Sequence, residues 1–180
     1  MLDTTSQVIA ALRDKFPDVE FAPAPLVKRA EGNKLADQTC VRVPPSQLRE
    51  IMQFLRDDDR CDYQQLCDLA GVDYLDFPDA RDRYAVLYSL LSLRRNHRLW
   101  VKCFVNDPTP TLPSVTGVWS GAEWMEREAW DMFGIRFTDH PDLRRILTWE
   151  GFKAHPLRKD YPLRGQGERV DFEVLTRDSR

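Results

Sequence analysis

Charged side chains that could do acid–base or metal chemistry are concentrated between residues 123 and 163, among aromatic residues, prolines and glycines. His140 and His155 lie there together with Glu128 and Asp160, and such groups could serve as metal ligands or as a general acid and base. The chain has 3 histidines and no His-Glu-x-x-His pattern, the spacing that places two imidazoles on one helix face. The spacing therefore does not favour independent catalysis. An N-cap role explains His140 better, and a turn or interface role explains His155.

Motifs for nucleotides and metal clusters are also missing from the sequence. Gly165 and Gly167 run into Val170 instead of completing a Gly-x-Gly-x-x-Gly loop, and no strand is expected before them. The 4 cysteines form no Cys-x-x-Cys pair, and the spacing of Cys61 and Cys67 matches cluster sites poorly. We expect free, buried thiols in a reducing compartment, and no cofactor or metal bound by this chain.

Composition places the chain among soluble globular proteins of one domain, or one domain with an appendage. It has 180 residues, of which 42% are hydrophobic and 31% charged. The isoelectric point near 5.7, with both signs of charge mixed along the chain, does not favour nucleic-acid binding. No segment approaches the roughly 20 apolar residues of a membrane helix, and the first residues do not resemble a signal peptide. Any membrane association is therefore expected to be indirect, through a partner.

The elements that precede the charged stretch are read from hydrophobic spacing and turn residues. Strands and helices mix without regular alternation, which predicts an α+β fold with a mixed or antiparallel sheet and helices packed on it. We expect His97 in a solvated turn, the strand around Gly71 bent or bulged, and the prolines from 108 to 113 in a rigid linker. The expected elements are helices over 4–16 and 45–56, strands over 19–21, 39–43, 66–74, 84–93 and 99–105, and a turn over 31–34.

A helix is predicted over about residues 121–133, within the charged stretch. Ser120 and Glu123 have capping-box spacing, and Gly134 is placed as the left-handed residue that ends the helix. Glu123, Arg127 and Asp131 recur every fourth residue and predict a charge row along one side of the helix. A second, apolar side should face the sheet, and it comprises Ala122, Met125, Ala129, Met132 and Phe133.

Residues 135–180 are predicted to form a short helix followed by an extended tail that wraps a partner, and residues 1–134 to form the globular domain. His140 is the expected N-cap of that short helix, which would carry Leu143 to Leu147. Prolines after residues 155 and 161 favour extended backbone beyond it. The alternation over 170–174 predicts a short strand that could add to a partner's sheet.

The charged stretch resembles the signature of one family over about forty residues. It reads Glu126-Arg127-Glu128-x-x-Asp131-Met132-Phe133-Gly134-Ile135, then His140-Pro141-Asp142-Leu143-Arg144-Arg145-Ile146-Leu147, then His155-Pro156-Leu157-Arg158-Lys159-Asp160-Tyr161-Pro162. These runs are similar to those of the 30-kilodalton subunit, also named the C subunit, of proton-translocating NADH–quinone oxidoreductase, respiratory complex I. No departure from the pattern occurs within them.

The resemblance implies a non-catalytic, hydrophilic subunit of the peripheral arm that scaffolds the quinone end by binding the 49-kilodalton subunit. It would support electron transfer from NADH to quinone coupled to proton translocation, with flavin and iron–sulfur clusters in partner subunits. The expected place is peripheral, on the cytoplasmic side of a bacterial inner membrane or the matrix side of an organelle, in a hetero-oligomer. The candidate interface residues are Glu126, Arg127, Glu128, Asp131, His140, Arg144, Arg145, His155, Arg158, Lys159, Asp160 and Tyr161.

Two alternatives stay open from the sequence. The chain could be the equivalent subunit of a relative of complex I, such as a ferredoxin-linked photosynthetic complex or a membrane-bound hydrogenase, whose subunits share this signature. It could also be an enzyme in its own right, although the histidine count and spacing argue against that reading.

Overall fold

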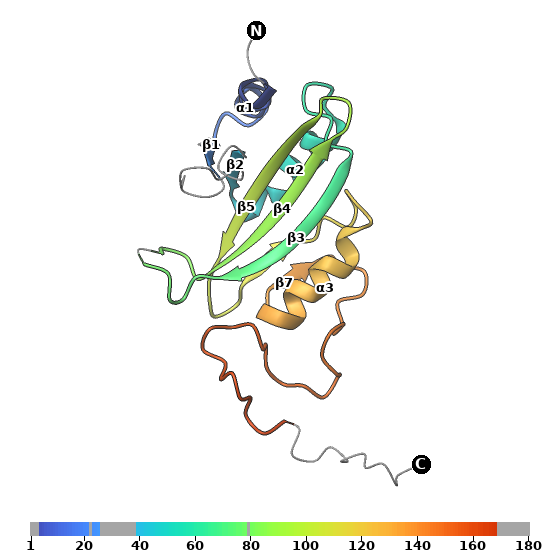
Figure 1. The fold of residues 1–180 in the computed structure, drawn as a ribbon. Helices are drawn as coiled ribbons and strands as arrows, with labels where there is room; N and C mark the ends of the chain where they lie inside the picture. The colour runs from blue at the N-terminus through green and yellow to red at the C-terminus, as the bar shows by residue number, and fades with distance from the viewer. Residues whose placement is uncertain (1–3, 22, 26–38, 79, 169–180) are drawn as a thin grey trace.

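The computed structural model describes residues 4–21, 23–25, 39–78 and 80–168 (Figure 1). A five-stranded sheet forms its centre, in the order β1 (Pro23–Pro25), β2 (Thr39–Val43), β5 (His97–Val105), β4 (Tyr84–Ser92) and β3 (Gln65–Asp73). β2 runs parallel to β5, whereas the other neighbouring strands are antiparallel. The α+β prediction with a mixed sheet is confirmed.

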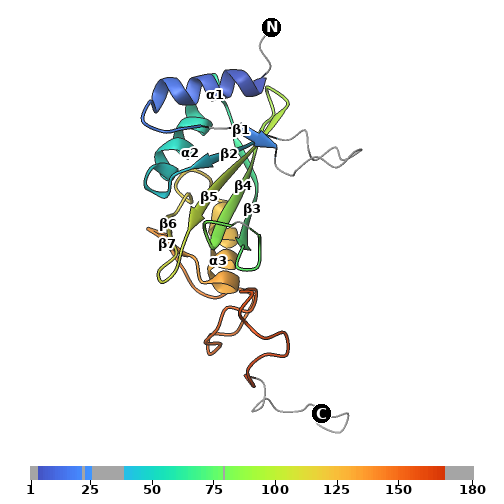
Figure 2. The ribbon, with the colours of Figure 1, turned by 90° about the vertical axis from the view of Figure 1, so that its left-hand side faces the viewer.

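One face of the sheet packs into the core, and the opposite face, called the open face here, is covered by no described helix. Tyr88 of β4 lies opposite Val101 of β5, which in turn lies opposite Val41 of β2, and all three are fully buried. Because side chains alternate between faces along a strand, the residues between them point to the open face. The helices α1 (Thr4–Lys15), α2 (Leu48–Asp57) and α3 (Ala122–Phe133) contribute to the same core as the buried face. Figures 1 and 2 show α2 behind the sheet and α1 across its upper end.

The amphipathic spacing of α2 places one stripe in the core, as predicted. Leu48, Ile51, Met52 and Leu55 recur at helical spacing and are all fully buried. A 3₁₀ turn over Pro45–Gln47 leads into the helix, since proline lacks the N–H that a first turn would leave unpaired.

The structure corrects three predictions in the N-terminal part. The strand expected over 19–21 is not formed, and the edge strand is β1 instead. His97 does not lie in a solvated turn: it begins β5, and its Nδ1 is 2.6 Å from the hydroxyl of Tyr63. Gly71 lies in regular register, because the shift in β3 falls between Leu66 and Asp68. The turn expected over 31–34 lies outside the described residues.

The absence of a side chain at Gly71 leaves room for α3. A Cβ at this position would lie 2.5 Å from the ring of Phe133, so the helix approaches the sheet here more closely than any larger residue would permit.

The proline-rich segment is more than a linker. It contains β6 (Thr111–Pro113), which pairs in parallel with β7 (Arg136–Thr138) in a second, two-stranded sheet. Leu112 and Phe137, opposite each other in this pair, are buried in the main core. Ile135 is also part of this core. The division of the chain at residue 134 stays a prediction.

Residues 139–168, which we call the tail, contain turns and bends but no helix or strand. The predicted helix over 143–147 is therefore wrong. The tail passes beside α3 and continues at the end of the molecule opposite α1 (Figures 1 and 2). The strand predicted over 170–174 lies outside the described residues.

Candidate functional site

Helix α3 is the element that organises the site. It begins at Ala122, with Gly121 as N-cap and no hydrogen bond from a capping side chain, so the predicted capping box is not formed. Only a backbone bond joins Glu123 N to Ser120 O, at 3.2 Å. The predicted end is confirmed, because Gly134 has φ +77° and its N–H donates to Trp130 O.

The charged residues of α3 are buried, which the sequence did not predict. Glu126 and Asp131 are fully inaccessible and Arg127 is 9% exposed, so two members of the predicted charge row, Arg127 and Asp131, lie in the interior. Spacing within a helix shows only which residues share a side. Here the loops that cover that side come from residues 114–116 and from the tail.

Asp131 holds three consecutive backbone amides of the tail. Its Oδ2 accepts from the N–H groups of Ile146, Leu147 and Thr148, at 3.1, 2.8 and 2.9 Å. Its Oδ1 accepts from Thr148 Oγ1 and from Arg145 Nη1, both at 2.5 Å. Burial alone would raise the pKa of Asp131, but the hydrogen bonds from Thr148 and its neighbours lower it to about 2. Because these amides donate to Asp131, they do not form the backbone hydrogen bonds of the helix predicted for 143–147.

Two arginines bind tail carbonyls around this carboxylate. Arg127 donates from Nε to Arg144 O at 3.1 Å and from Nη2 to Arg145 O at 2.9 Å. Arg145 in turn donates to Ala154 O at 3.1 Å, and its guanidinium lies over the rings of Trp130 and Phe152. Within the described chain Arg127 therefore binds peptide groups, whereas Arg145 forms the ion pair with Asp131.

The tail also closes the C-terminal end of α3. The last carbonyls of a helix have no partner inside the helix. Here the carbonyls of residues 131–133 accept from the tail: Asp131 O from His155 Nδ1 at 3.0 Å, Met132 O from Leu157 N at 3.1 Å, and Phe133 O from Arg158 Nε at 2.6 Å.

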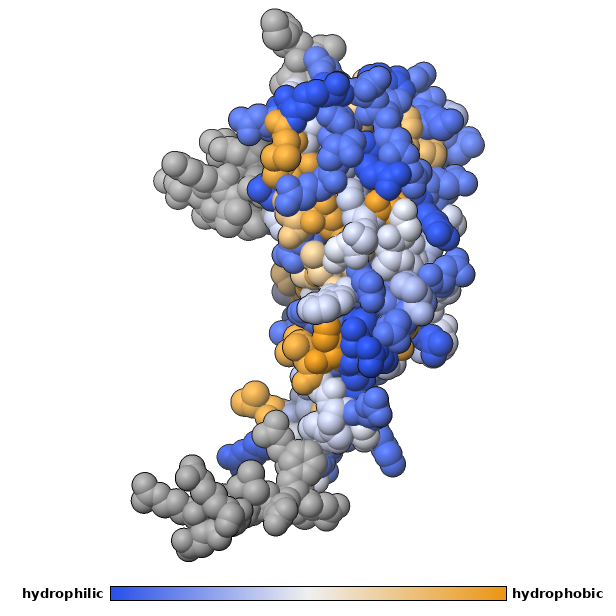
Figure 3. Space-filling model, turned by 90° about the vertical axis from the view of Figure 1, so that its right-hand side faces the viewer, coloured by the Kyte–Doolittle hydropathy of each residue, from blue (hydrophilic) through white to orange (hydrophobic). Residues whose placement is uncertain are grey.

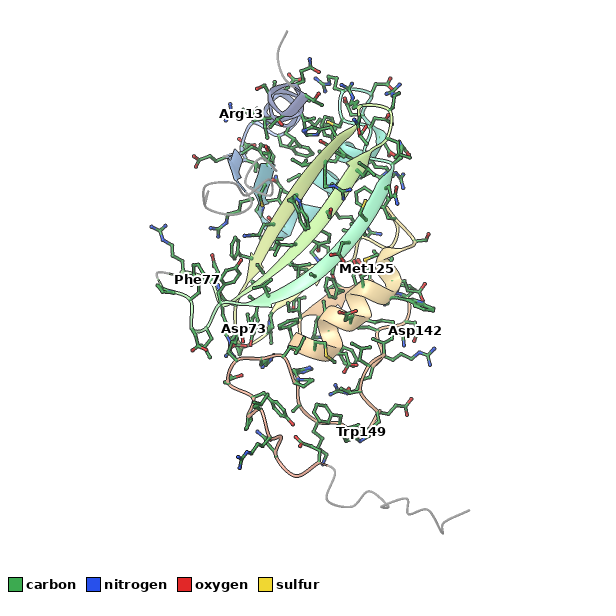
Figure 4. The ribbon with its side chains drawn as sticks, in the orientation of Figure 1. Arg13, Asp73, Phe77, Met125, Asp142 and Trp149 are labelled. Carbon is green, nitrogen blue, oxygen red and sulfur yellow. The ribbon has the colours of Figure 1, made fainter. Side chains whose placement is uncertain are left out.

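A second attachment joins the tail to the end of the main sheet. The buried Asp73 at the end of β3 accepts from Lys159 N at 2.9 Å. Figure 4 shows Asp73 where the sheet meets the tail. Arg83 pairs with Asp160 at 2.6 Å and with Asp107 at 2.6 Å. The hydrogen bond from Arg83 lowers the pKa of Asp160.

Glu126 anchors a different loop from the same helix. Its carboxylate accepts from Val115 N and from Ser114 Oγ, both at 2.7 Å. Burial raises the pKa of Glu126 to about 7, although these two hydrogen bonds oppose the shift. His140 Nε2 lies 3.9 Å from the carboxylate and 3.0 Å from Glu123 O.

The hydrogen bonds of His140 define its tautomer. Its Nδ1 accepts from Asp142 N at 3.0 Å, so Nε2 carries the proton and donates to Glu123 O. His140 is thus a neutral anchor for the first turn of the tail and does not cap a helix.

The remaining predicted site residues are peripheral to these contacts. Glu128 is exposed on α3, and Arg144 pairs with Asp142 at 2.7 Å on the surface. Tyr161 bonds Glu168 and packs against the ring of Phe152. The sequence reading missed Asp73, Arg83, Ser114 and Thr148. No local spacing signals them, since each partner is distant in the sequence.

The outer surface of the tail is apolar in part and hollowed. Leu147, Leu157 and Leu163 are exposed, Leu163 fully so. A hollow of about 630 Å³ lies beside them, lined by Trp149, Phe152, Pro156, Tyr161, Leu163, Arg164 and four further tail residues. Figure 3 shows hydrophobic surface on the tail as well as on the body above it.

Neither a metal cluster nor a membrane span is found in the part of the chain that the structure describes. Its His, Cys, Asp and Glu side chains form no group of three or more suited to holding a metal ion. Its helices are all too short or too polar to cross a membrane. The buried charges of the site bind the chain's own backbone and side chains and so hold the tail in place.

The residues that hold the tail lie in a segment that matches a known protein family. Residues 41–167 match the family model for the respiratory-chain NADH dehydrogenase, 30 Kd subunit. The chain belongs to this family. The match includes α3, both attachments of the tail and every candidate interface residue, so the resemblance seen in the sequence is confirmed.

Curated relatives of this 30-kDa subunit family align along much of the chain. The C subunit of NADH-quinone oxidoreductase from Rhodospirillum rubrum is 42% identical over 175 residues, covering 97% of this chain and 79% of the relative. The C subunit from Paramagnetospirillum magneticum is 50% identical over 165 residues, covering 91% of this chain and 80% of the relative. NADH-ubiquinone oxidoreductase subunit 9 of Reclinomonas americana is 48% identical over 134 residues, covering 74% of this chain and 64% of the relative.

Solved structures share the fold of this family member. A trypsin-resistant fragment (1-134) of Nqo5 is 32% identical, with a TM-score of 0.63, and covers 78% of this chain and all of the fragment. A chain of the archaeal membrane-bound sulfane sulfur reductase aligns with a TM-score of 0.68 over 97% of this chain and 95% of that one. Its identity is 19%, so it shows the fold alone.

Proposed function

We propose that the chain is a non-catalytic structural subunit of NADH–quinone oxidoreductase that holds the 49-kilodalton subunit in the peripheral arm. Membership of the 30-kDa subunit family supports the assignment of the chain to this complex. The observation that carries the structural role is the use of the buried charges: Asp131, Arg127 and Arg145 all hold the tail in one conformation. Groups engaged in this way serve as anchors rather than as acids, bases or ligands.

The anchored tail suits a binding role because it is ordered before a partner arrives. Association normally loses free energy to the ordering of loops and side chains. Contacts to α3 and to Asp73 already order residues 140–161. The exposed leucines of the tail would then contact the partner. A few well-packed anchor residues carry most of the binding free energy at interfaces.

The redox chemistry belongs to other subunits in this proposal. Flavin and iron–sulfur clusters in partner chains would carry electrons from NADH to quinone, coupled to proton translocation. This chain would keep the quinone-end module assembled. It would lie at the cytoplasmic side of a bacterial membrane, or the matrix side of an organelle, and contact the membrane only through the complex.

The test separates assembly from turnover. Arg145→Ala, and Arg127→Ala likewise, should reduce the amount of assembled complex on native gels, because the tail loses two or more hydrogen bonds. Turnover per assembled complex should stay unchanged. The control is Arg60→Ala, whose side chain pairs with Asp14 and Asp58 on the surface and is not a candidate interface residue. Normal assembly with lost turnover would contradict the proposal.

Co-purification distinguishes the remaining alternative, an equivalent subunit of a related complex. A tagged chain should bring down the 49-kilodalton subunit together with an NADH-oxidising flavoprotein. Recovery of a hydrogenase or a ferredoxin-linked complex in place of that flavoprotein would favour the alternative.

A further inference from the structure

The open face of the main sheet lies away from the helices and from the tail. The outward residues of β5 are Arg98, Trp100, Lys102 and Phe104, all half-buried, while the residues between them are in the core. In Figure 1 this face points toward the reader, with α2 behind it. No described helix covers it. We call the outward side chains of β4 and β5 on this side the open sheet face.

The open sheet face is more apolar than a solvated sheet face usually is. Antiparallel sheets with one solvated face normally alternate hydrophobic and polar residues. Here Leu87 and Leu91 of β4 lie opposite Lys102 and Arg98, and both leucines are only half-buried.

One end of this face carries an aromatic cluster. Tyr74 packs edge-on against Phe77, with ring centroids 5.5 Å apart, and lies 5.9 Å from the ring of Phe104. Phe77 is 62% exposed, and Figure 4 shows it on a loop projecting beyond the strands. Aromatic side chains and arginine are enriched at protein interfaces relative to the rest of the surface.

Two cations on the face have no carboxylate partner among the described residues. Arg98 donates to Ser89 Oγ at 3.1 Å, and Lys102 donates to the hydroxyl of Tyr74 at 3.2 Å. Arg42, opposite Lys102, is already paired with Asp82 at 2.8 Å. Within the described ranges, Asp68 on the edge strand β3 pairs with neither cation. The face is thus locally positive on a chain whose net charge is −3.

We propose that the open sheet face is a second protein-binding surface, and that its occupant is an acidic segment of a neighbouring subunit. Arg98 and Lys102 are four residues apart on one strand, so their side chains emerge about 13 Å apart. The matching segment would present two carboxylates at that separation, with apolar side chains between them to cover Leu87 and Leu91 of β4. The inference rests on the proposed function, because it places the chain within a complex.

Charge favours this occupant over a second copy of the chain. A symmetric dimer through this face would bring the same cations against one another, and like charges in contact disfavour association. A carboxylate beside each cation would instead fix the register of the two partners. The apolar side chains would exclude water from the pairs.

Chemical labelling of the purified complex tests the proposal at Lys102. The probe is an amine-acetylating reagent, applied to the isolated chain and to the assembled complex and read by peptide mass spectrometry. Lys102 should be acetylated several-fold more slowly in the complex. A carbodiimide, which joins an amine to a carboxylate in direct contact, should link Lys102 to an aspartate or glutamate of another subunit.

A charge reversal supplies the matched variant. Lys102→Glu should abolish the cross-link and weaken retention of the chain by the complex about tenfold, the effect of 1.4 kcal/mol. Lys15→Glu, at the exposed end of α1, is the control and should leave retention unchanged. An unchanged melting temperature of the isolated Lys102→Glu chain would show that the sheet still folds.

The possible results separate this inference from the proposed function. Equal acetylation of Lys102 in the free chain and in the complex would overturn the inference alone. So would cross-links confined to this chain or to a second copy of it. A chain that does not enter the complex at all would overturn the proposed function.

Discussion

Asp131 joins two segments that lie apart in the sequence, and its carboxylate has no spare acceptor capacity directed at solvent. Asp131→Asn replaces one carboxylate oxygen with a donor that would face the N–H groups of the tail or Arg145. It should lower the free energy of unfolding by on the order of 3–5 kcal/mol, because a buried charge loses its partner. Urea denaturation of the purified chain measures this.

Asp142 provides the control for that substitution. It pairs with Arg144, and its side chain is 47% exposed. Asp142→Asn should change the free energy of unfolding by no more than about 0.5 kcal/mol, as is usual at the surface. Equal losses in the two variants would show that the amide contacts of Asp131 add no stability.

Glu126 should make stability depend on pH. Its pKa is raised from 4.5 to about 7 in the folded chain. Between those values the folded state keeps a proton that the unfolded state has released, so stability falls as pH rises from 4.5 to 7. His155 has the opposite effect, because burial lowers its pKa below 6.5 and stability is lost as pH falls.

Comparing Glu126→Gln with the unsubstituted chain isolates the carboxyl group, since both retain His155. The melting temperature of the unsubstituted chain, relative to that of the variant, should fall as pH is raised through this window. Calorimetry at several pH values measures the difference. A difference that does not change with pH would mean that Glu126 is ionised throughout.

At the scale of the element, the C-terminal end of α3 requires a glycine, at Gly134, whereas its N-terminal end at Gly121 does not. Gly134 has φ +77°, and a Cβ there would lie 2.7 Å from the ring of His155. Gly134→Ala should lower stability by about 1–3 kcal/mol through backbone strain alone, and should displace the tail. Trypsin should then cleave faster after Lys153 and Arg158.

Gly121 is the matched control for that change. It has a helical backbone, and no heavy atom lies within 4 Å of a Cβ built there. Gly121→Ala should be neutral or should stabilise the chain by up to about 1 kcal/mol. Similar proteolysis of the two variants would mean that the tail does not depend on the end of α3.

Elements whose pattern is local were predictable from the sequence. The stripe of α2, the alternation of β5 and the end of α3 at Gly134 follow from periodicity and from glycine's freedom at positive φ. Elements that depend on a distant partner were not. β7 is three residues long and exists through its pairing with β6, and the amides of residues 146–148 bind Asp131 instead of forming a helix.

The site was predictable as a set of residues but not as a set of contacts. The charged signature identified Arg127, Asp131 and Arg145, but the predicted charge row did not indicate that two of them are buried. These side chains are buried by loops from distant parts of the sequence, and local sequence patterns do not predict where those loops pack. The interface role of the twelve candidate residues remains a proposal.

For the whole molecule, the tail is attached at two places: at α3, and at the sheet through Asp73 and Arg83. Arg83→Gln removes the ion pairs with Asp73, Asp107 and Asp160, all at the second place. Trypsin should then cleave faster after Arg158 and Lys159. The melting temperature should also fall, because the fully buried side chain of Asp73 loses its cation. Limited proteolysis followed by mass spectrometry measures the cleavage.

The control for the whole-molecule test is Arg42→Gln. Arg42 pairs with Asp82, and its side chain is 60% exposed. Cleavage of the tail should be unaffected in this variant. Unchanged cleavage in Arg83→Gln as well would mean that α3 alone holds the tail.

Closure of α3 by residues 155–158 has a consequence for biosynthesis. When Gly134 leaves the ribosome, the last carbonyls of the helix still lack the donors that will pair with them. Those donors follow about two dozen residues later, on the order of seconds at usual elongation rates. A nascent chain that stalls in this interval would expose the open end of the helix. Such a product would differ from the finished protein in a way that cellular proteases and chaperones can detect.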